Sequence, residues 1–233
     1  MEVCLFLIGT RDNTPLFDIP ALYHAAHAIE GLRRLVVHES IEADVDPRIA
    51  VNPDSPSCVL QWYFDDLAAL EAALRPAGTI RDALDASTRT RVDAQAFSQQ
   101  IMAVRALVPP QAISAQDGTQ RCSYLVAYEG PAEDFSAWLT HYLDHHPPLM
   151  LQLPGLRELE IYTRMDSRSG LPFLQANAMQ RNKVVFDDPA SLAGALASPV
   201  RDAMRRDFHA LPAYSGATPH YAMRSFYGNL ASH

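Results

Sequence analysis

The sequence predicts an α+β fold made of two similar halves, each with the element order β-α-β-β-α-β. The first reason is an internal repeat, because four segments of the first half recur in the same order in the second, at offsets of 118 to 124 residues. The second is that strand-type alternation and helix-type periodicity follow one another in that order. We therefore predict a first repeat over residues 1–107, a linker over 108–120 and a second repeat over 121–233.

The repeated segments are short, and loop insertions explain the drift of their offsets. The four matches are CLFLIG (4–9) with CSYLVA (122–127), GLRRLVVHE (31–39) with GLRELEIYT (155–163), FDD (64–66) with FDD (186–188), and MAVRAL (102–107) with YAMRSF (221–226). We interpret them as an ancient duplication. The proline-containing stretch VPPQAISAQDGTQ separates the two copies.

The elements of the second half follow from local patterns. Strands are predicted at 122–128, 156–164, 176–186 and 220–228, and helices at 133–145 and 187–199. The first helix is predicted because Phe135, Trp138 and Tyr142 recur at helical spacing. The second has an aspartate cap and Pro189 near its first turn. This order is that of the ferredoxin-like unit, whose four-stranded antiparallel sheet carries both helices on one face and leaves the other bare.

Residues 142 to 156 contain a distinctive run: Tyr142, His146 four residues later, Pro148-Leu149, and Pro154-Gly155-Leu156 followed by a predicted strand. In this run the sequence resembles the EthD-like family of the dimeric α/β-barrel superfamily. The resemblance implies that two ferredoxin-like units face each other as a barrel, usually from two chains. A tandem duplication would build this barrel within one chain, as a monomer or a homodimer. The first repeat is seven residues shorter here, so we expect it to be degenerate, with the motif loop shortened.

His146 is the residue that we expect to carry chemistry, because imidazole titrates near neutral pH and can act as a general acid or base. Proline disfavours helical geometry in the residue before it, so Pro147 and Pro148 predict that the helix stops at His146 and releases its side chain toward a cavity. The resemblance supports this role, since the histidine at the family position is the one usually considered functional. His145 and Tyr142 are the expected assistants. The alternative is that His145 and His146 merely cap a helix end.

A metal site is the competing interpretation of the same run. His141 and His145 are four residues apart, on one face of the predicted helix, and this spacing can hold a metal ion. The run contains no His-Glu-x-x-His motif and no third ligand, and Asp144 points elsewhere on the helix. We therefore predict no metal and no cofactor, and we assign His141 and Asp144 to substrate binding.

Strand alternation predicts further pocket residues. Glu160 and Tyr162 lie on the strand face expected to point into the barrel, and His38 lies on the equivalent face of the first half. Arg224 is matched by Arg105 in the other half, and the favoured alternative to substrate binding is that this duplicated arginine pairs with an acidic residue between the sheets. The predicted substrate-binding residues are thus His141, Asp144, Glu160, Tyr162, Arg224 and His38.

The first functional hypothesis is an enzyme that uses histidine acid/base chemistry on a small aromatic or lactone-like organic compound. The resemblance implies an oxidative degradation or biosynthetic pathway, and oxidoreductase, isomerase and lyase chemistry all stay open, because a fold shared by many functions does not choose among them. A non-catalytic ligand-binding protein, accessory to an oxygenase, is the alternative. Haem binding is a weaker one.

Composition limits the partners. The net charge of −8 would repel nucleic acids and anionic membrane surfaces. No apolar run approaches the ~20 residues of a membrane-spanning helix. The three cysteines are widely spaced, and the first residues lack the pattern of a signal peptide, so we expect a cytoplasmic protein without disulfides.

Overall fold

The structure is a computed structural model of the 233-residue chain, and it describes residues 1–10, 15–41, 45–46, 48–49 and 55–230. The first half contains β1 (Val3–Gly9), α1 (Ile19–Ala26), β2 (Leu32–Ser40), β3 (Cys58–Phe64), α2 (Leu67–Ala73), α3 (Thr79–Ala86) and β4 (Phe97–Leu107). The second half contains β5 (Gln120–Tyr128), α4 (Phe135–Met150), β6 (Glu158–Arg164), β7 (Leu174–Gln175), β8 (Gln180–Phe186), α5 (Pro189–Leu196), α6 (Val200–Ala210) and β9 (His220–Asn229).

Within the described part of the chain, eight antiparallel strands close into a barrel. The order is β1-β3-β2-β9-β5-β8-β6-β4, and β4 pairs with β1 to complete the circle. The halves meet at two antiparallel junctions, β2 with β9 and β4 with β6. The short strand β7 pairs with β4 in parallel. The predicted fold class, two ferredoxin-like units forming an intramolecular barrel, is confirmed. Of the predicted linker, residues 108–119 lie between β4 and β5, and Gln120 is the first residue of β5.

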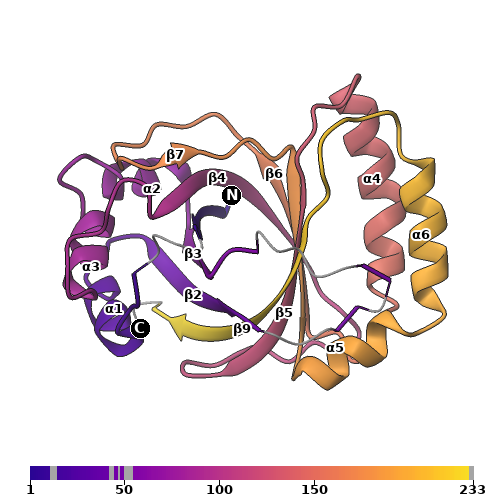
Figure 1. Ribbon diagram of the computed structural model, residues 1–233, viewed down its shortest axis with the longest axis horizontal. Coiled ribbons are helices and arrows are strands. Elements are labelled where there is room, and N and C mark those ends of the chain that lie inside the picture. Colours follow the sequence, from indigo (N-terminus) through magenta and orange to yellow (C-terminus); the bar gives the residue numbers. More distant parts are fainter. Residues whose placement is uncertain (11–14, 42–44, 47, 50–54, 231–233) are drawn as a thin grey trace.

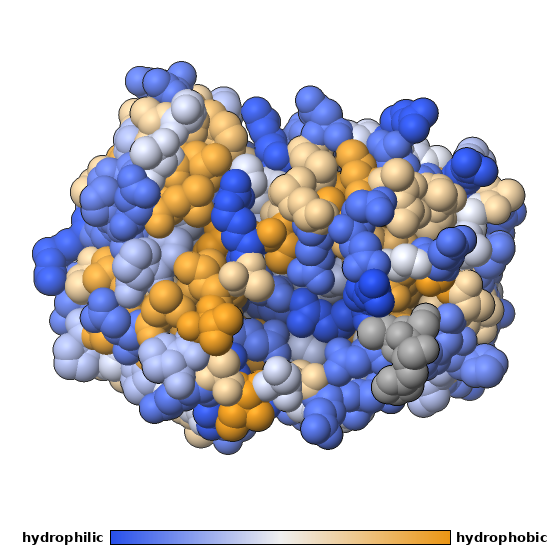
Figure 2. All heavy atoms as spheres, turned by 180° about the vertical axis from the view of Figure 1, so that it is seen from behind, coloured by the Kyte–Doolittle hydropathy of each residue, from blue (hydrophilic) through white to orange (hydrophobic). Residues whose placement is uncertain are grey.

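The helices form two layers outside the barrel. Figure 1 shows α1, α2 and α3 on one side and α4, α5 and α6 on the other. The reverse face is a mixture of hydrophobic and hydrophilic side chains (Figure 2). None of the described helices combines the length and the apolar character that a membrane crossing requires.

Three hydrophobic clusters hold these layers together. Trp62 belongs to the cluster beneath α1–α3 and Trp138 to the cluster beneath α4–α6, and both side chains are fully buried. The third cluster fills the barrel itself and includes Phe6, Tyr162 and Met223. Side chains alternate between the two faces of a strand, so the strands of each half pack against a helix layer with one face and line the barrel interior with the other.

The repeated FDD segments have the same structure in both halves. Asp66 caps α2 by accepting a hydrogen bond from Ala69 N at 2.9 Å, and Asp188 caps α5 in the same way through Ser191 N at 2.7 Å. The cap of the second half was predicted from the sequence, and the first half has the same one. The preceding aspartate of each copy forms an ion pair with the arginine of its own Gly-Leu-Arg segment: Arg33 with Asp65 at 2.7 Å, and Arg157 with Asp187 at 2.5 Å.

Helix α4 corrects one prediction. It does not stop at His146 but continues through Pro147 and Pro148 to Met150. Each proline removes one backbone donor, but Pro147 and Met150 are buried, and this packing outweighs the local preference. The last turn is closed by Leu151 N, which donates to the Pro147 carbonyl at 2.9 Å. The second half is therefore longer here because its helix is longer, 16 residues in α4 against 8 in α1, and not because of an added loop.

Candidate functional site

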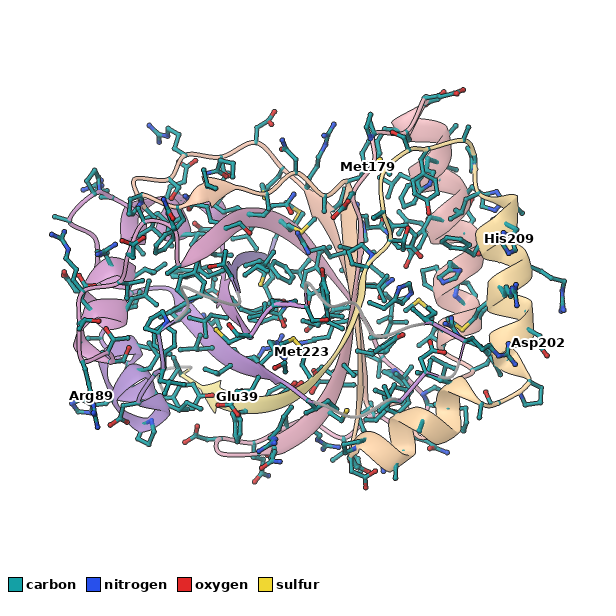
Figure 3. The ribbon with its side chains drawn as sticks, viewed as in Figure 1. Glu39, Arg89, Met179, Asp202, His209 and Met223 are labelled. Atoms are coloured by element: carbon teal, nitrogen blue, oxygen red, sulfur yellow. The ribbon has the colours of Figure 1, made fainter. Side chains whose placement is uncertain are left out.

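A pocket of about 220 Å³ lies between the outer face of the second sheet and the α4–α6 layer. We call it the α4–α6 pocket. Its described lining residues are Arg48, Ile49, Tyr128, His146, Arg201, Met204, Arg205, Phe208, His209 and His220. Helix α6 supplies half of them, and Figure 3 marks two positions of this helix, Asp202 and His209, beside α4. The pocket is thus outside the barrel, whereas Met223 in the same view lies in the barrel interior.

His146 forms the α4 side of the pocket and is only 5% exposed. Its Nδ1 lies 2.7 Å from Oδ2 of Asp207 on α6. An ionised carboxylate can only accept, so Nδ1 carries the proton, and Nε2 of the neutral ring is left as a base. Burial lowers the pKa of His146, and the hydrogen bond to Asp207 opposes this shift. The pair has the geometry of a base held by a carboxylate.

His220 on β9 supplies a second imidazole. Its Nδ1 donates to the Thr218 carbonyl at 2.7 Å, which leaves Nε2 unprotonated in the neutral ring. Burial, assisted by the charge of Arg201, lowers the pKa of His220 to about 4. The ring therefore stays neutral at pH 7. Tyr124 packs beside it, with ring centroids 5.5 Å apart.

Two arginines of the pocket are held by aspartates. Arg201 binds Asp46 at 2.8 Å, and Arg48 binds Asp202 at 2.6 Å. Asp46 belongs to the segment between β2 and β3, so the first half of the chain contributes to a wall of the pocket. Arg205 is exposed at the pocket and has no ion pair among the residues that the structure describes.

The apolar part of the pocket comes from Tyr128, Met204 and Phe208. The rings of Tyr128 and Phe208 are 6.4 Å apart. Burial raises the pKa of Tyr128 well above its usual range, so its phenol is neutral at physiological pH. An apolar surface with a few converging polar atoms is typical of sites for small organic molecules.

The other predicted residues of the run around His146 do not line this pocket. Tyr142 is fully buried in the hydrophobic cluster beneath α4–α6, and its hydroxyl accepts a hydrogen bond from Asn182 Nδ2 at 2.8 Å. Asp144 is exposed. His145 is also exposed, and its Nδ1 donates to the His141 carbonyl at 2.8 Å. His141 is half-buried, with Nε2 3.4 Å from Asp207 Oδ1. Of the run, only His146 is among the residues that line the α4–α6 pocket.

Glu160, Tyr162 and His38 face the barrel interior, the side that alternation predicted. There they belong to a packed polar network. Glu160 binds Arg34 at 2.6 Å and Lys183 at 2.8 Å, and it also accepts hydrogen bonds from Tyr63 and Tyr162.

His38 extends this network through Gln61, whose Oε1 lies 2.7 Å from His38 Nε2. Gln61 Nε2 in turn donates to the Tyr162 hydroxyl at 2.9 Å. The network is on the opposite face of the sheet from the α4–α6 pocket, so a role of these residues in binding substrate stays a prediction.

Arg224 lies on the outer face of β9 and is exposed, as Arg105 is on β4. Arg105 donates to Thr163 Oγ1 at 2.6 Å rather than to a carboxylate. Among the described residues neither arginine forms an ion pair, so the expected pairing with an acidic residue between the sheets is not what the structure has.

Helix α6 is the part of the site that the sequence analysis missed. It contributes Asp207, Met204 and Phe208, yet the predicted elements leave residues 200–219 unassigned. A signal was present, because Val200, Met204 and Phe208 recur every four residues, as on one face of a helix. Charged residues between them, two arginines in succession included, give this stretch the composition of a loop.

No protein-family model matches the sequence, and no curated protein does. Among solved structures, an anthrone oxidase-like protein aligns with a TM-score of 0.62 and 14% identity, over 99% of this chain and 94% of that one. A proposed monooxygenase from Fusobacterium nucleatum aligns with a TM-score of 0.58 and 9% identity, over 98% and 94% of the two chains. These likenesses show the fold. The two halves of this chain together form one α/β-barrel.

The similarity to the EthD family is more limited in extent. An ethyl tert-butyl ether D (EthD) family protein from Bacillus halodurans shares 22% identity over 43% of this chain and 95% of its own, with a TM-score of 0.35.

Proposed function

We propose that the protein is a small-molecule enzyme in which His146, oriented by Asp207, transfers a proton to or from an organic substrate bound in the α4–α6 pocket. The observation that carries this proposal is the 2.7 Å hydrogen bond between His146 Nδ1 and Asp207 Oδ2 at the pocket wall. It leaves Nε2 as the atom that exchanges the proton. A general base that is positioned in this way typically contributes 10²–10⁴-fold to a rate.

The size and lining of the pocket indicate the kind of substrate. A volume of about 220 Å³ is below the ~300–1,000 Å³ of drug-sized sites, which favours a compound of one or two rings. Tyr128 and Phe208 offer aromatic surface, and Arg205 offers a positive charge at the pocket. These features suit an aromatic or lactone-like compound that is an anion or becomes one when it loses a proton.

As part of this proposal, we infer the reaction type by analogy with proteins of the same fold. The neighbours described as an anthrone oxidase-like protein and as a proposed monooxygenase support oxidative chemistry, and the run from Tyr142 to Leu156 supports an EthD-like relationship. Loss of a proton to His146 would leave an electron-rich carbanion or phenolate, and this is the form of an aromatic substrate from which dioxygen, as the external oxidant, most easily takes electrons. In this scheme the protein provides binding, orientation and the base.

The test combines binding and turnover for wild type, His146→Gln and Asp207→Asn, with a panel of phenols, anthrones and lactones. His24→Ala is the matched control, because His24 is an exposed histidine of α1 in the other half. We expect His146→Gln to retain binding within a few-fold and to lose about 10²–10⁴-fold in turnover. Asp207→Asn should lose part of the same effect, and His24→Ala none.

Two outcomes would contradict the proposal. Equal turnover in wild type and His146→Gln would remove His146 from the chemistry. A ligand that binds in the pocket without being turned over, with His146→Gln changing only its affinity, would instead indicate an accessory binding protein.

A further inference from the structure

We propose that His141, His145 and Asp207 form a binding site for a divalent transition-metal ion between α4 and α6. Each of the three residues offers one potential ligand atom, and these three atoms all lie within 4.8 Å of one another. Among the described residues, this is the group of histidine, cysteine or acidic side chains that could hold a metal ion. His141 and His145 come from one face of α4, with ring centroids 4.4 Å apart, and Asp207 comes from α6. Neither His141 nor His145 lines the α4–α6 pocket, so the metal site lies beside the one proposed above and shares Asp207 with it.

The hydrogen bond of His145 prepares its ring for a metal. Its Nδ1 lies 2.8 Å from the carbonyl oxygen of His141. A carbonyl oxygen only accepts, so Nδ1 carries the proton and Nε2 of the neutral ring has a free lone pair. Metal-binding histidines are commonly fixed in this way, with one nitrogen held by a backbone carbonyl and the other on the ion. Since His145 is exposed, an ion can reach it from solvent.

His141 has the opposite feature, a nitrogen without a hydrogen-bond partner. Its Nε2 is buried and makes no hydrogen bond, although it lies 3.4 Å from Asp207 Oδ1. Buried polar atoms are rarely left unsatisfied, and an atom that is left so requires an explanation such as an ion. An ion held jointly by this nitrogen and the neighbouring carboxylate oxygen would satisfy both.

Asp207 is already oriented for this task. Its Oδ2 accepts from His146, which fixes the carboxylate and turns Oδ1 toward His141. The carboxylate would therefore bridge, with one oxygen on the His146 ring and the other on the ion. This arrangement gives a role to both oxygens of an aspartate that lies against two histidines of the same helix.

The ligand types select the class of ion. Two imidazoles and one carboxylate suit Zn²⁺, Fe²⁺, Co²⁺ or Ni²⁺, whereas Mg²⁺ and Ca²⁺ prefer oxygen ligands. Ligand atoms on one ion, each at about 2.1 Å, can be at most ~4.2 Å apart. His141 Nε2 and Asp207 Oδ1, 3.4 Å apart, already meet this limit, and the exposed side chain of His145 can turn to bring its own nitrogen within it. Three protein ligands leave at least one position for water.

The sequence prediction of no metal rested on the lack of a third ligand in the histidine run. The proposed third ligand, Asp207, comes 62 residues after His145, on the helix that the sequence analysis did not assign. The spacing of His141 and His145 alone could not identify it.

The proposal is tested with the full-length chain, freed of any histidine tag and treated with EDTA, by calorimetric titration with Zn²⁺ and by visible absorption of the Co²⁺ form. We expect one ion per chain. His145→Ala and His141→Ala should each weaken binding by at least about 10-fold, as even changes around the ligands of a metal site do. His27→Ala, which removes an exposed histidine just after α1, should bind like wild type. Millimolar Mg²⁺ should not displace the bound ion.

Equal Zn²⁺ affinity in wild type and His145→Ala would overturn the proposal and identify an adventitious ion only. Binding of several ions with the same loss in His27→Ala would do the same. Circular dichroism of His145→Ala separates loss of the site from loss of the fold, and substitution of this exposed residue is expected to leave the spectrum unchanged. No substrate enters this experiment, so its outcome is independent of whether His146 is catalytic.

Discussion

Lys183 and Glu160 are joined by a 2.8 Å ion pair inside the barrel, where Lys183 is completely shielded from water and Glu160 is 4% exposed. Burial alone would raise the pKa of the Glu160 carboxyl, but the charges of Lys183 and Arg34 outweigh it and hold that pKa well below its usual range. The Glu160 carboxyl is therefore ionised at pH 7, and its charge depends on its two basic neighbours.

Breaking this pair on one side should be costly. Glu160→Gln would leave Lys183 and Arg34 without their shared carboxylate, and the expected loss is about 3–5 kcal/mol in the free energy of unfolding. The double variant Glu160→Gln/Lys183→Met should lose less than the sum of the two single variants, because it leaves fewer unpaired charges. Urea denaturation measures all three. Strict additivity would show that the pair is not coupled.

Acid should destabilise the fold through His38. Burial, with the nearby charge of Lys183, lowers the pKa of His38 to about 3 in the folded protein, against ~6.5 when unfolded. As pH falls below 6.5 the unfolded chain takes up this proton first, so stability is lost between about pH 6.5 and 3. The loss at pH 5 is about 2 kcal/mol from this group. His38→Gln should flatten that part of the stability–pH curve, and His24→Ala should not. An unchanged slope in His38→Gln contradicts the prediction.

Arg205 should select for negatively charged ligands, because it lies at the pocket without an ion pair among the described residues. Arg205→Ala should weaken binding of an aromatic carboxylate by at most about 5-fold, the range of an exposed ion pair, and the effect should shrink in high salt. The uncharged amide of the same compound serves as the control ligand. Equal losses for acid and amide would mean that Arg205 acts through packing instead.

Pro148 should be a site where proline can be removed with a gain in stability. It is exposed within α4, whereas Pro147 is buried. Pro148→Ala restores a backbone donor for the helix, and the expected net gain is about 1 kcal/mol after the added entropy of the unfolded chain is subtracted. Pro147→Ala should instead destabilise, because it leaves a cavity. Thermal denaturation of the two variants gives the comparison, and a lower melting temperature for Pro148→Ala would refute the first part.

The barrel could be predicted from the sequence because its strands show a local alternation of side chains. Glu160 and Tyr162 alternate with Leu159 and Ile161, and the structure has the first pair inside and the second against the helices. The internal repeat added the long-range information, since two copies of one unit imply how they face each other. Local pattern and topology agree here, and such agreement is what makes a fold predictable.

The site was less accessible to sequence reasoning, for two physical reasons. The contact of His146 with Asp207 joins residues 61 positions apart, and neither residue has a local pattern that indicates its partner. The continuation of α4 through Pro147 depends on the burial of this residue in the folded protein, which local helix propensity does not contain. His146 was predicted because imidazole chemistry and family resemblance indicated the same residue, and the structure has it in the wall of the α4–α6 pocket.

The closure of the barrel within one chain has a consequence for its assembly. A barrel built from two chains falls apart on dilution, whereas here the two sheets are tethered by the segment between Leu107 and Gln120. A short tether of this kind keeps its ends at an effective concentration in the millimolar range. The junctions β2–β9 and β4–β6 therefore form at the same local concentration in a dilute cell extract as in a concentrated stock. The two halves can also differ in sequence. A substitution near His146 occurs once in this barrel, whereas in a barrel of two identical chains it would occur in both halves.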